Sequence, residues 1–332
     1  MQPGFVVNRP FRDSNIGSNL SSLIGALWIA RQLKRELIVD WRGLRQLRDD
    51  SLNYFSEFLW LPEEIFGVKL HTAPLAGATY DEGSEAARWV EPAEARKIAT
   101  NGDEALPHYL VLQTYHGLDR VHPGPEAARL RLMRAFYRQL RPAVRIQDAI
   151  DAWVAGNLSA PFVVGVNVRT GNGAYFRAGD RYVDRVDISL FENERRLMRL
   201  LERVCRARLK MVPPAFREDF QIFYATDSAE MSQVLAGLPN AVTRRGTFPP
   251  PGEGDLYTFG DSGYTDRDSI DDTVADMFLL ARCDALVYNT SLFNQYARVV
   301  TGYFGGNQAH FETILIRKRL QQLAMSARRR LR

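Results

Sequence analysis

Short apolar runs alternate with helix-forming segments along this chain, and this alternation limits the folds open to it. Residues 5–7 are apolar, residues 20–28 carry apolar side chains at helical spacing, and a second apolar run follows at 37–39. A strand, a loop, a helix and a second strand in this order form the unit from which parallel sheets are built. The sequence therefore predicts an α/β protein.

The same alternation returns in the second half of the chain. The apolar run at 162–166 is continuous, as expected of a strand that is covered on both faces. Further strands are predicted at 110–112, 220–224 and 285–288, and helices at 126–140, 192–209, 276–282 and 291–300. Residues 50–150 carry weaker signals and are interrupted by prolines. We therefore expect two α/β halves that meet near residues 150–160.

The composition is that of a globular protein and excludes several other classes. The 332 residues are 45% hydrophobic and 25% charged, which rules out a disordered tail, a coiled coil or a collagen. Residues 317–332 hold seven basic side chains and no acidic one, which leaves 36 basic against 39 acidic residues elsewhere. The net charge of +4 thus reflects a basic tail, and no nucleic-acid partner is predicted.

Cysteine usage and hydropathy indicate a cytoplasmic protein. Cys205 and Cys283 have no spacing suited to a metal and are expected to be buried thiols. The apolar run at 20–30 is shorter than the roughly 20 residues of a membrane-spanning helix. The tail at 313–332 alternates apolar and basic side chains, so it is either a frayed terminus or a helix that lies peripherally on an anionic inner membrane.

Four polar loops follow the predicted strands, at the edge of a parallel sheet where ligands bind. Residues 15–19, 167–173, 226–228 and 289–291 are rich in small polar residues and Gly, which suit phosphate oxygens. Arg169 adds a guanidinium fork for a diphosphate. No GxxxxGK[ST] or GxGxxG pattern is present, which argues against P-loop NTPases and dinucleotide dehydrogenases. A nucleotide-sugar transferase fits the remaining pattern.

The chain also resembles the NodZ-like α1,6-fucosyltransferase family in several segments of the same order and spacing. The resemblance extends from about Phe5 to Arg298 and is weakest in residues 50–150. The matching segments are NIGSNLSSL at 15–23, LIVDWRG at 37–43, VGVNVRTGNG at 164–173, ATDSA at 225–229 and DMFLLARC at 276–283, with further matches up to 298.

This resemblance implies a fold and an activity. The family has two Rossmann-like domains in a GT-B-type arrangement with a cleft between them. It implies an acceptor-side domain at 1–155 and a GDP-sugar-binding domain at 156–312, followed by the tail at 313–332. The implied reaction moves fucose, or a related deoxyhexose, from a GDP-sugar to a hydroxyl of an oligosaccharide. It inverts the anomeric centre, uses no metal ion or other cofactor, and points to a bacterial enzyme.

The resemblance also assigns roles to individual residues. Arg169 matches the family's essential arginine, which binds the β-phosphate and stabilises the departing GDP. Asp276 matches the carboxylate that accepts hydrogen bonds from guanine. The other implied donor-binding positions are Gly17, Asn167, Thr226, Asp227 and Ser291.

Three positions depart from the family pattern. Asn167 stands where the family usually has His, Ala174 where it has an acidic residue, and Asn15 where it has a glycine. Since Asn cannot titrate near pH 7, the general base is sought elsewhere, and the candidates are Asp180, Asp184 and Asp187. An inactive glycan- or nucleotide-binding module on the same fold is the alternative that these losses leave open.

One short pattern suggests a metal site. Asp266, Arg267 and Asp268 form a DxD sequence, which in another glycosyltransferase fold holds a divalent cation. Here it falls in a polar stretch at 260–272 and not directly after an apolar strand. We therefore expect a flexible lid or a cluster of acids at a helix N-terminus, where carboxylates are favourable, and no metal ion.

Overall fold

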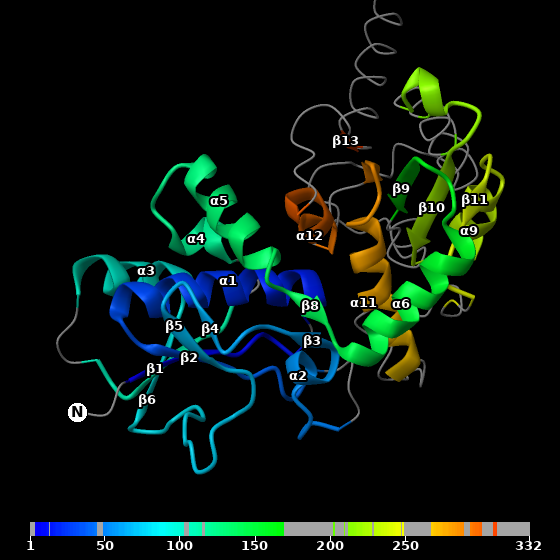
Figure 1. Cartoon of the computed structure of the whole chain (residues 1–332). Helices are drawn as coiled ribbons and strands as arrows, with labels where there is room; N and C mark the ends of the chain where they lie inside the picture. Colours follow the sequence, from blue (N-terminus) through cyan, green and yellow to red (C-terminus); the bar gives the residue numbers. More distant parts are fainter. Residues whose placement is uncertain are drawn as a thin grey trace, which may run out of the picture. The chain divides into compact units, whose positions relative to one another are not determined.

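A computed structural model of the chain describes most of its residues (Figure 1). The described residues are 4–12, 14–44, 49–102, 106–114, 117–168, 202, 209, 212–227, 229–246, 248, 267–288, 293–300 and 308–310. The chain divides into two compact units. Unit 1 comprises Met1–Ala149 and Gly260–Ala275, and unit 2 comprises Ile150–Phe259 and Asp276–Arg332.

Unit 1 is built on a six-stranded sheet in the order β4-β5-β2-β1-β7-β6. Every neighbouring pair in it is parallel except β4 with β5. The strands are β1 (Phe5–Asn8), β2 (Glu36–Val39), β4 (Glu64–Ile65), β5 (Val68–His71), β6 (Ala87–Val90) and β7 (Tyr109–Leu112). The predicted strands at 5–7, 37–39 and 110–112 are therefore confirmed. Two further short strands, β3 (Leu59–Trp60) and β8 (Arg141–Pro142), pair antiparallel.

The longest helix of unit 1 is buried along most of its length. Residues 16–30 of α1 (Ile16–Leu33) are all buried, polar ones included, because the sheet and other helices cover it. The Asn15 side chain caps its start by accepting a hydrogen bond from the Ser18 N–H at 3.0 Å. The remaining helices are α2 (Tyr54–Phe58), α3 (Pro92–Asn101), α4 (Leu118–Val121) and α5 (Glu126–Tyr137). The helix predicted at 126–140 is thus α5.

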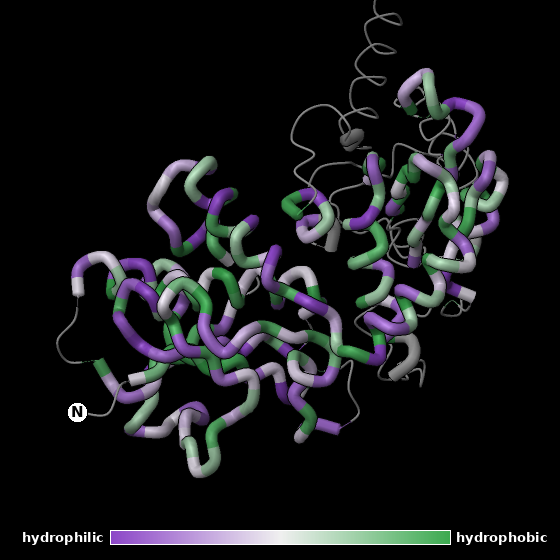
Figure 2. Tube along the Cα trace, in the orientation of Figure 1, coloured by the Kyte–Doolittle hydropathy of each residue, from purple (hydrophilic) through white to green (hydrophobic). Residues whose placement is uncertain are grey.

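Unit 2 contains a five-stranded parallel sheet in the order β11-β10-β9-β12-β13. The strands are β9 (Val163–Val168), β10 (Gln221–Thr226), β11 (Ala241–Val242), β12 (Ala285–Tyr288) and β13 (Gln308–His310). All six residues of the central strand β9 are buried, as its continuous apolar run predicts. Figure 2 shows β10 as largely hydrophobic and α6 (Val144–Asn157) as alternating in hydropathy. The other elements here are η3 (Pro214–Phe216), α9 (Ala229–Ala236) and α12 (Phe293–Val300).

Two sequence-based expectations need correction. The helix expected at 276–282 is α11 (Arg267–Leu280), which begins nine residues earlier, so acidic residues of the polar stretch lie in its first turns, in agreement with the expected alternative of an acid cluster at a helix N-terminus. Its first turns are polar but are held in place, since Ile270 is buried and Arg145 donates two hydrogen bonds to Asp271, at 3.1 and 2.7 Å. Helix α6 was not predicted, because its amphipathic pattern lies in the proline-interrupted region. Within the described part of the chain, no helix is long and apolar enough to cross a membrane.

Candidate functional site

The carboxyl ends of three parallel strands in unit 2 bring predicted donor-binding residues together. Asn167 lies near the end of β9, where it is paired in register with Ala225 of β10 and Tyr288 of β12. Thr226 is the last residue of β10, and Asp227 follows it. All three predicted side chains are buried. Parallel strands end at the same edge of a sheet, which is where nucleotides bind in this class of fold.

Two buried polar atoms at this edge have no protein partner within the described residues. The Asn167 Nδ2 group donates to the Ala225 carbonyl at 3.2 Å, but the Asn167 Oδ1 atom accepts no hydrogen bond there. The Thr226 Oγ1 atom on the neighbouring strand is also buried and forms no hydrogen bond with a described residue. A buried polar atom without a hydrogen bond costs about 1–3 kcal/mol. Folded proteins carry few of them, so this pair indicates a place where a polar ligand or ordered water binds.

Asp276 is held by an arginine that the sequence analysis missed. The Arg245 Nε atom lies 3.6 Å from Asp276 Oδ2, and the two side chains are only 10% and 4% exposed. Arg245 comes three residues after β11, the parallel neighbour of β10, so the chain reaches it at the same edge of the sheet. No motif contains Arg245, and its only signal in the sequence is its place shortly after a short apolar run.

A second arginine stands near the end of β12. The Arg298 guanidinium of α12 lies over the Tyr288 ring, with its carbon 4.8 Å from the ring centroid. Its Nε atom is buried, with no hydrogen-bond partner in the described part of the chain. Arg298 belongs to a segment that carries the family resemblance, but that resemblance gave it no role. A buried guanidinium N–H without a partner is a donor that an anionic ligand can use.

The structure describes only some of the predicted site residues. Gly17 is described in unit 1, where it is the second residue of α1 and is buried. Arg169, Ser291 and the candidate bases Asp180, Asp184 and Asp187 lie outside the described residues. The described part of the chain contains no group of three or more His, Cys, Asp or Glu side chains placed to hold a metal ion. Cys283 is a buried free thiol, as predicted, while Cys205 is not described.

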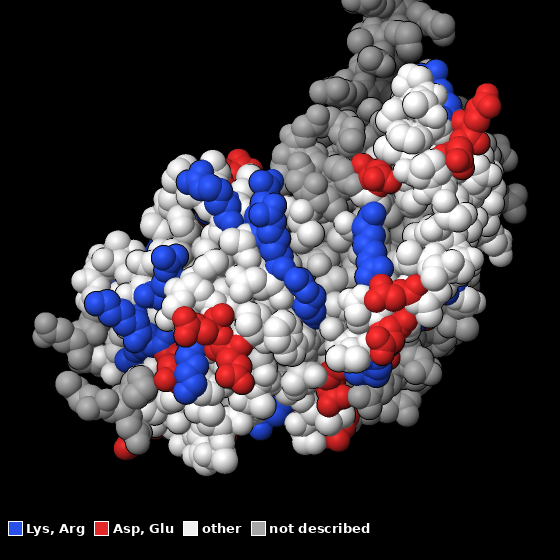
Figure 3. Space-filling view, in the orientation of Figure 1, with Lys and Arg blue, Asp and Glu red and all other residues white. Residues whose placement is uncertain are grey.

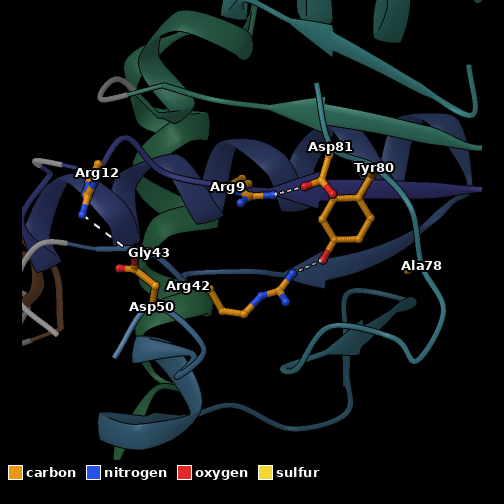
Figure 4. Close-up of a pocket in the computed structure, with 8 residues that line it drawn as sticks. All are labelled: Arg9, Arg12, Arg42, Gly43, Asp50, Ala78, Tyr80 and Asp81. Atoms are coloured by element: carbon orange, nitrogen blue, oxygen red, sulfur yellow. Dashed lines mark hydrogen bonds and ion pairs between the residues drawn. The ribbon is translucent and has the colours of Figure 1, made fainter. Parts of the chain in front are cut away.

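Unit 1 contains a polar pocket that the sequence analysis did not identify (Figure 4). It has a volume of about 350 Å³ and lies near the carboxyl ends of β1 and β2. It is lined by Arg9, Arg12, Arg42, Gly43, Asp50, Ala78, Tyr80 and Asp81. On the face shown in Figure 3, basic and acidic side chains are interspersed.

A fully buried carboxylate organises this pocket. Asp40, which follows β2, accepts hydrogen bonds from Arg42 Nε at 2.8 Å and Arg42 Nη2 at 2.9 Å. Its Oδ2 atom also accepts one from the Tyr80 hydroxyl at 2.9 Å. Burial alone would raise the pKa of Asp40, but the hydrogen bonds and positive charge of Arg42 outweigh it and lower that pKa. Burial and the nearby Asp40 charge raise the pKa of Tyr80.

Comparison with known proteins identifies the family. The model of the family "Nodulation protein Z (NodZ)" matches residues 129–304, more than half of the chain. The chain belongs to the nodulation protein Z family. It is 26% identical over 319 residues to nodulation protein Z of Bradyrhizobium diazoefficiens, covering 89% of this chain and 78% of that protein. Nodulation protein Z of Azorhizobium caulinodans is 26% identical over 303 residues, with 86% of each chain covered.

Solved structures show that the fold is shared. The NodZ α-1,6-fucosyltransferase in crystals soaked with GDP-fucose aligns with a TM-score of 0.58 at 20% identity, covering 90% of this chain and 93% of that one. POFUT1 in complex with GDP-fucose aligns with a TM-score of 0.53 at 12% identity, covering 93% and 98%. The predicted mixed α/β fold is therefore confirmed.

Proposed function

We propose that this protein is a glycosyltransferase that moves fucose from GDP-fucose to a hydroxyl group of an oligosaccharide, with inversion and without a metal ion. Membership of the nodulation protein Z family supports this, because a solved NodZ is described as an α-1,6-fucosyltransferase. We further propose two Rossmann-like domains at 1–155 and 156–312 in a GT-B-type arrangement. The two sheets of mainly parallel strands, one in each unit, support that architecture.

The unpartnered polar atoms on β9 and β10 carry this proposal. Asn167 Oδ1 and Thr226 Oγ1 are buried at the sheet edge where nucleotides bind in α/β folds, without partners in the described part of the chain. Their amide and hydroxyl chemistry suits the hydroxyl and phosphate groups of a nucleotide-sugar. The proposed donor site in unit 2 includes Asn167, Thr226, Asp227 and Asp276, and the family resemblance adds Arg169 and Ser291 to it.

The chemistry of the transfer sets the roles of these side chains. Breaking the bond between sugar and phosphate leaves negative charge on GDP, and fixed cations stabilise such a leaving group. We assign this role to Arg169. An ionised Asp276 would accept hydrogen bonds from two guanine N–H groups. Asn167 cannot take up a proton from the acceptor hydroxyl, so Asp180, Asp184 and Asp187 remain our candidates for the general base.

Thr226→Val tests the donor site with two opposite readouts. Val has nearly the same shape but no hydroxyl, so removing an unpartnered buried group should leave stability unchanged or raise it by about 1 kcal/mol. The same change should weaken GDP binding roughly tenfold in calorimetric titration, because the ligand then loses a hydrogen bond of about 1.4 kcal/mol. Thr100→Val, at an exposed helix position in unit 1, is the control and should not alter GDP affinity. Unchanged GDP affinity in Thr226→Val would contradict the proposed site.

Activity is tested by GDP release from GDP-fucose in a screen of oligosaccharide acceptors. We expect turnover that persists in EDTA and is lost in Arg169→Ala while the circular dichroism spectrum is retained. GDP-fucose binding without GDP release for any acceptor would instead identify a binding module. Faster turnover with another GDP-deoxyhexose would reassign the donor sugar.

A further inference from the structure

The polar pocket of unit 1 has the size and lining of a site for a charged sugar residue. Its volume of about 350 Å³ is near the lower end of the range of small-molecule sites. Guanidinium groups, carboxylates and a tyrosine line it, and none of its described lining residues has a large aliphatic side chain. Figure 4 shows Arg9, Arg42 and Tyr80 arranged around one side and Arg12 with Asp50 at the other. Such a lining favours a polar, water-soluble ligand over an apolar one.

One arginine of the pocket is rigidly oriented and still has donors to offer. Asp40 holds Arg42 through its Nε and Nη2 atoms, and the buried carboxylate cannot swing away. This leaves the Nη1 N–H groups of Arg42 without an acceptor among the residues that the structure describes. A guanidinium fixed in advance loses little conformational freedom when it binds a ligand.

The other two arginines are each paired with an exposed carboxylate that an anion can replace, and Arg9 Nη1 also lies 3.9 Å from the buried Asp40 Oδ2. Arg9 Nη1 lies 3.2 Å from Asp81, whose side chain is 86% exposed, and Arg12 Nη2 lies 3.9 Å from Asp50, which is 67% exposed. Exposed ion pairs contribute little to stability, so displacing these carboxylates costs little. Among the residues that the structure describes around the pocket, three arginines and one buried carboxylate, Asp40, keep their places when these two exposed carboxylates turn away. An anion that displaces Asp50 and Asp81 therefore meets guanidinium groups as its nearest charges.

We propose that this pocket binds an anionic group of the acceptor, namely the carboxylate or phosphate of an acidic sugar. The inference rests on the proposed function, since it names the class of acceptor that the transferase would use. Carboxylates and phosphates both accept paired hydrogen bonds from a guanidinium fork, which gives orientation as well as affinity. Arg9, Arg12 and Arg42 come from segments after two neighbouring strands, so the sheet itself sets their spacing.

Direct binding measurements on the full chain test this proposal without a donor. The probes are methyl glucuronide for a carboxylate, glucose 6-phosphate for a phosphate, and methyl glucoside as the neutral match. We expect at least one anionic probe to bind tenfold or more tightly than methyl glucoside, with an affinity that falls as salt rises. The tighter of the two anionic probes identifies the acidic group. Equal affinity for the neutral probe would overturn the proposal.

Paired variants give the sharpest test, because they shift affinity in opposite directions. Arg9→Gln should weaken binding of the anionic probe about tenfold. Asp81→Asn should tighten it about threefold, since it removes the carboxylate that competes for Arg9. The control is Glu94→Gln, which makes the same change in charge in the Arg88–Glu94 ion pair of unit 1. Weaker binding in Asp81→Asn, or equal tightening in Glu94→Gln, would contradict an anion site built on Arg9.

These results separate the two proposals. If anionic probes fail to bind while GDP is still released from GDP-fucose, the acceptor assignment falls and the transferase proposal stands. If the probes bind in an Arg9-dependent way but no acceptor supports GDP release, the pocket stands as an anion site and the transferase proposal falls.

Discussion

Replacing the buried carboxylate of unit 1 tests the reasoning about its polar pocket. In Asp40→Asn the side chain keeps its shape but loses its charge and one acceptor oxygen. Asp40 accepts two hydrogen bonds from Arg42 and one from Tyr80, at 2.8–2.9 Å. Hydrogen bonds to a charged group contribute about 1.5–3 kcal/mol each. Because the Arg42 side chain is 35% exposed and water can replace part of what is lost, we expect a net loss of about 3 kcal/mol.

Native-state hydrogen exchange, resolved by mass spectrometry, measures this loss in each unit separately. A loss of about 3 kcal/mol corresponds to roughly a hundredfold faster exchange at amides of β1 and β2. Amides of β9 and β10 in unit 2 serve as the internal reference. The control variant is Asp81→Asn, which makes the same substitution in an exposed side chain and should change stability by less than about 0.5 kcal/mol. Unchanged exchange in unit 1 of Asp40→Asn would refute the role given to this carboxylate.

The pH dependence of that difference has a definite sign. The pKa of Asp40 is lowered in the folded protein, so its contribution is fully present above the unfolded-state pKa of about 4. The contribution is lost as the pH falls through the lower, folded-state pKa. We therefore expect the stability difference between the wild type and Asp40→Asn to be largest at neutral pH and to shrink in acid.

Two further predictions concern close packing and thiol chemistry. A Cβ atom on Gly117 would collide with the Ser21 carbonyl oxygen of α1, so Gly117→Ala should lower the urea midpoint by the equivalent of about 3 kcal/mol. Gly156→Ala is the control, since its added Cβ meets nothing within 4 Å, and equal midpoints for the two variants would contradict the packing argument. Cys283 is buried and burial raises the pKa of its thiol, so it should stay unmodified by maleimide in the native protein at pH 8. Rapid labelling of Cys283, mapped by mass spectrometry, would show that the reagent reaches this thiol in the native protein and would contradict its burial.

Local sequence signals were sufficient for six of the strands (β1, β2, β7, β9, β10 and β12) and for several helices, but they missed the shorter strands. The runs at 5–7, 37–39 and 285–288 became β1, β2 and β12, because continuous apolar residues identify a strand that is covered on both faces. The beginning of α11 was misplaced because its first turns are mostly polar, and one of their contacts is with the distant Arg145. Helix propensity and periodicity are local properties and carry no information about such partners.

For the candidate site, the family resemblance named Asn167, Thr226 and Asp276, but the sequence did not show how these residues are held. The pairing of Asp276 with Arg245, and the unpartnered Thr226 hydroxyl, became visible only in the folded chain. The first joins helix α11 to the segment that follows β11, and the second lies on β10, whose neighbouring strand β9 is far away in the sequence. A search for local motifs could not have found Arg245.

The sequence by itself determined that the chain alternates strands and helices, places polar loops after its strands, and resembles one enzyme family. Only the tertiary structure decided that Arg9, Arg42 and Tyr80 line one pocket around a buried Asp40. The physical reason is that apolar periodicity depends only on residues that are close together in the sequence. The environment of a charged side chain is set instead by residues that the parallel sheet brings together from segments tens of positions apart.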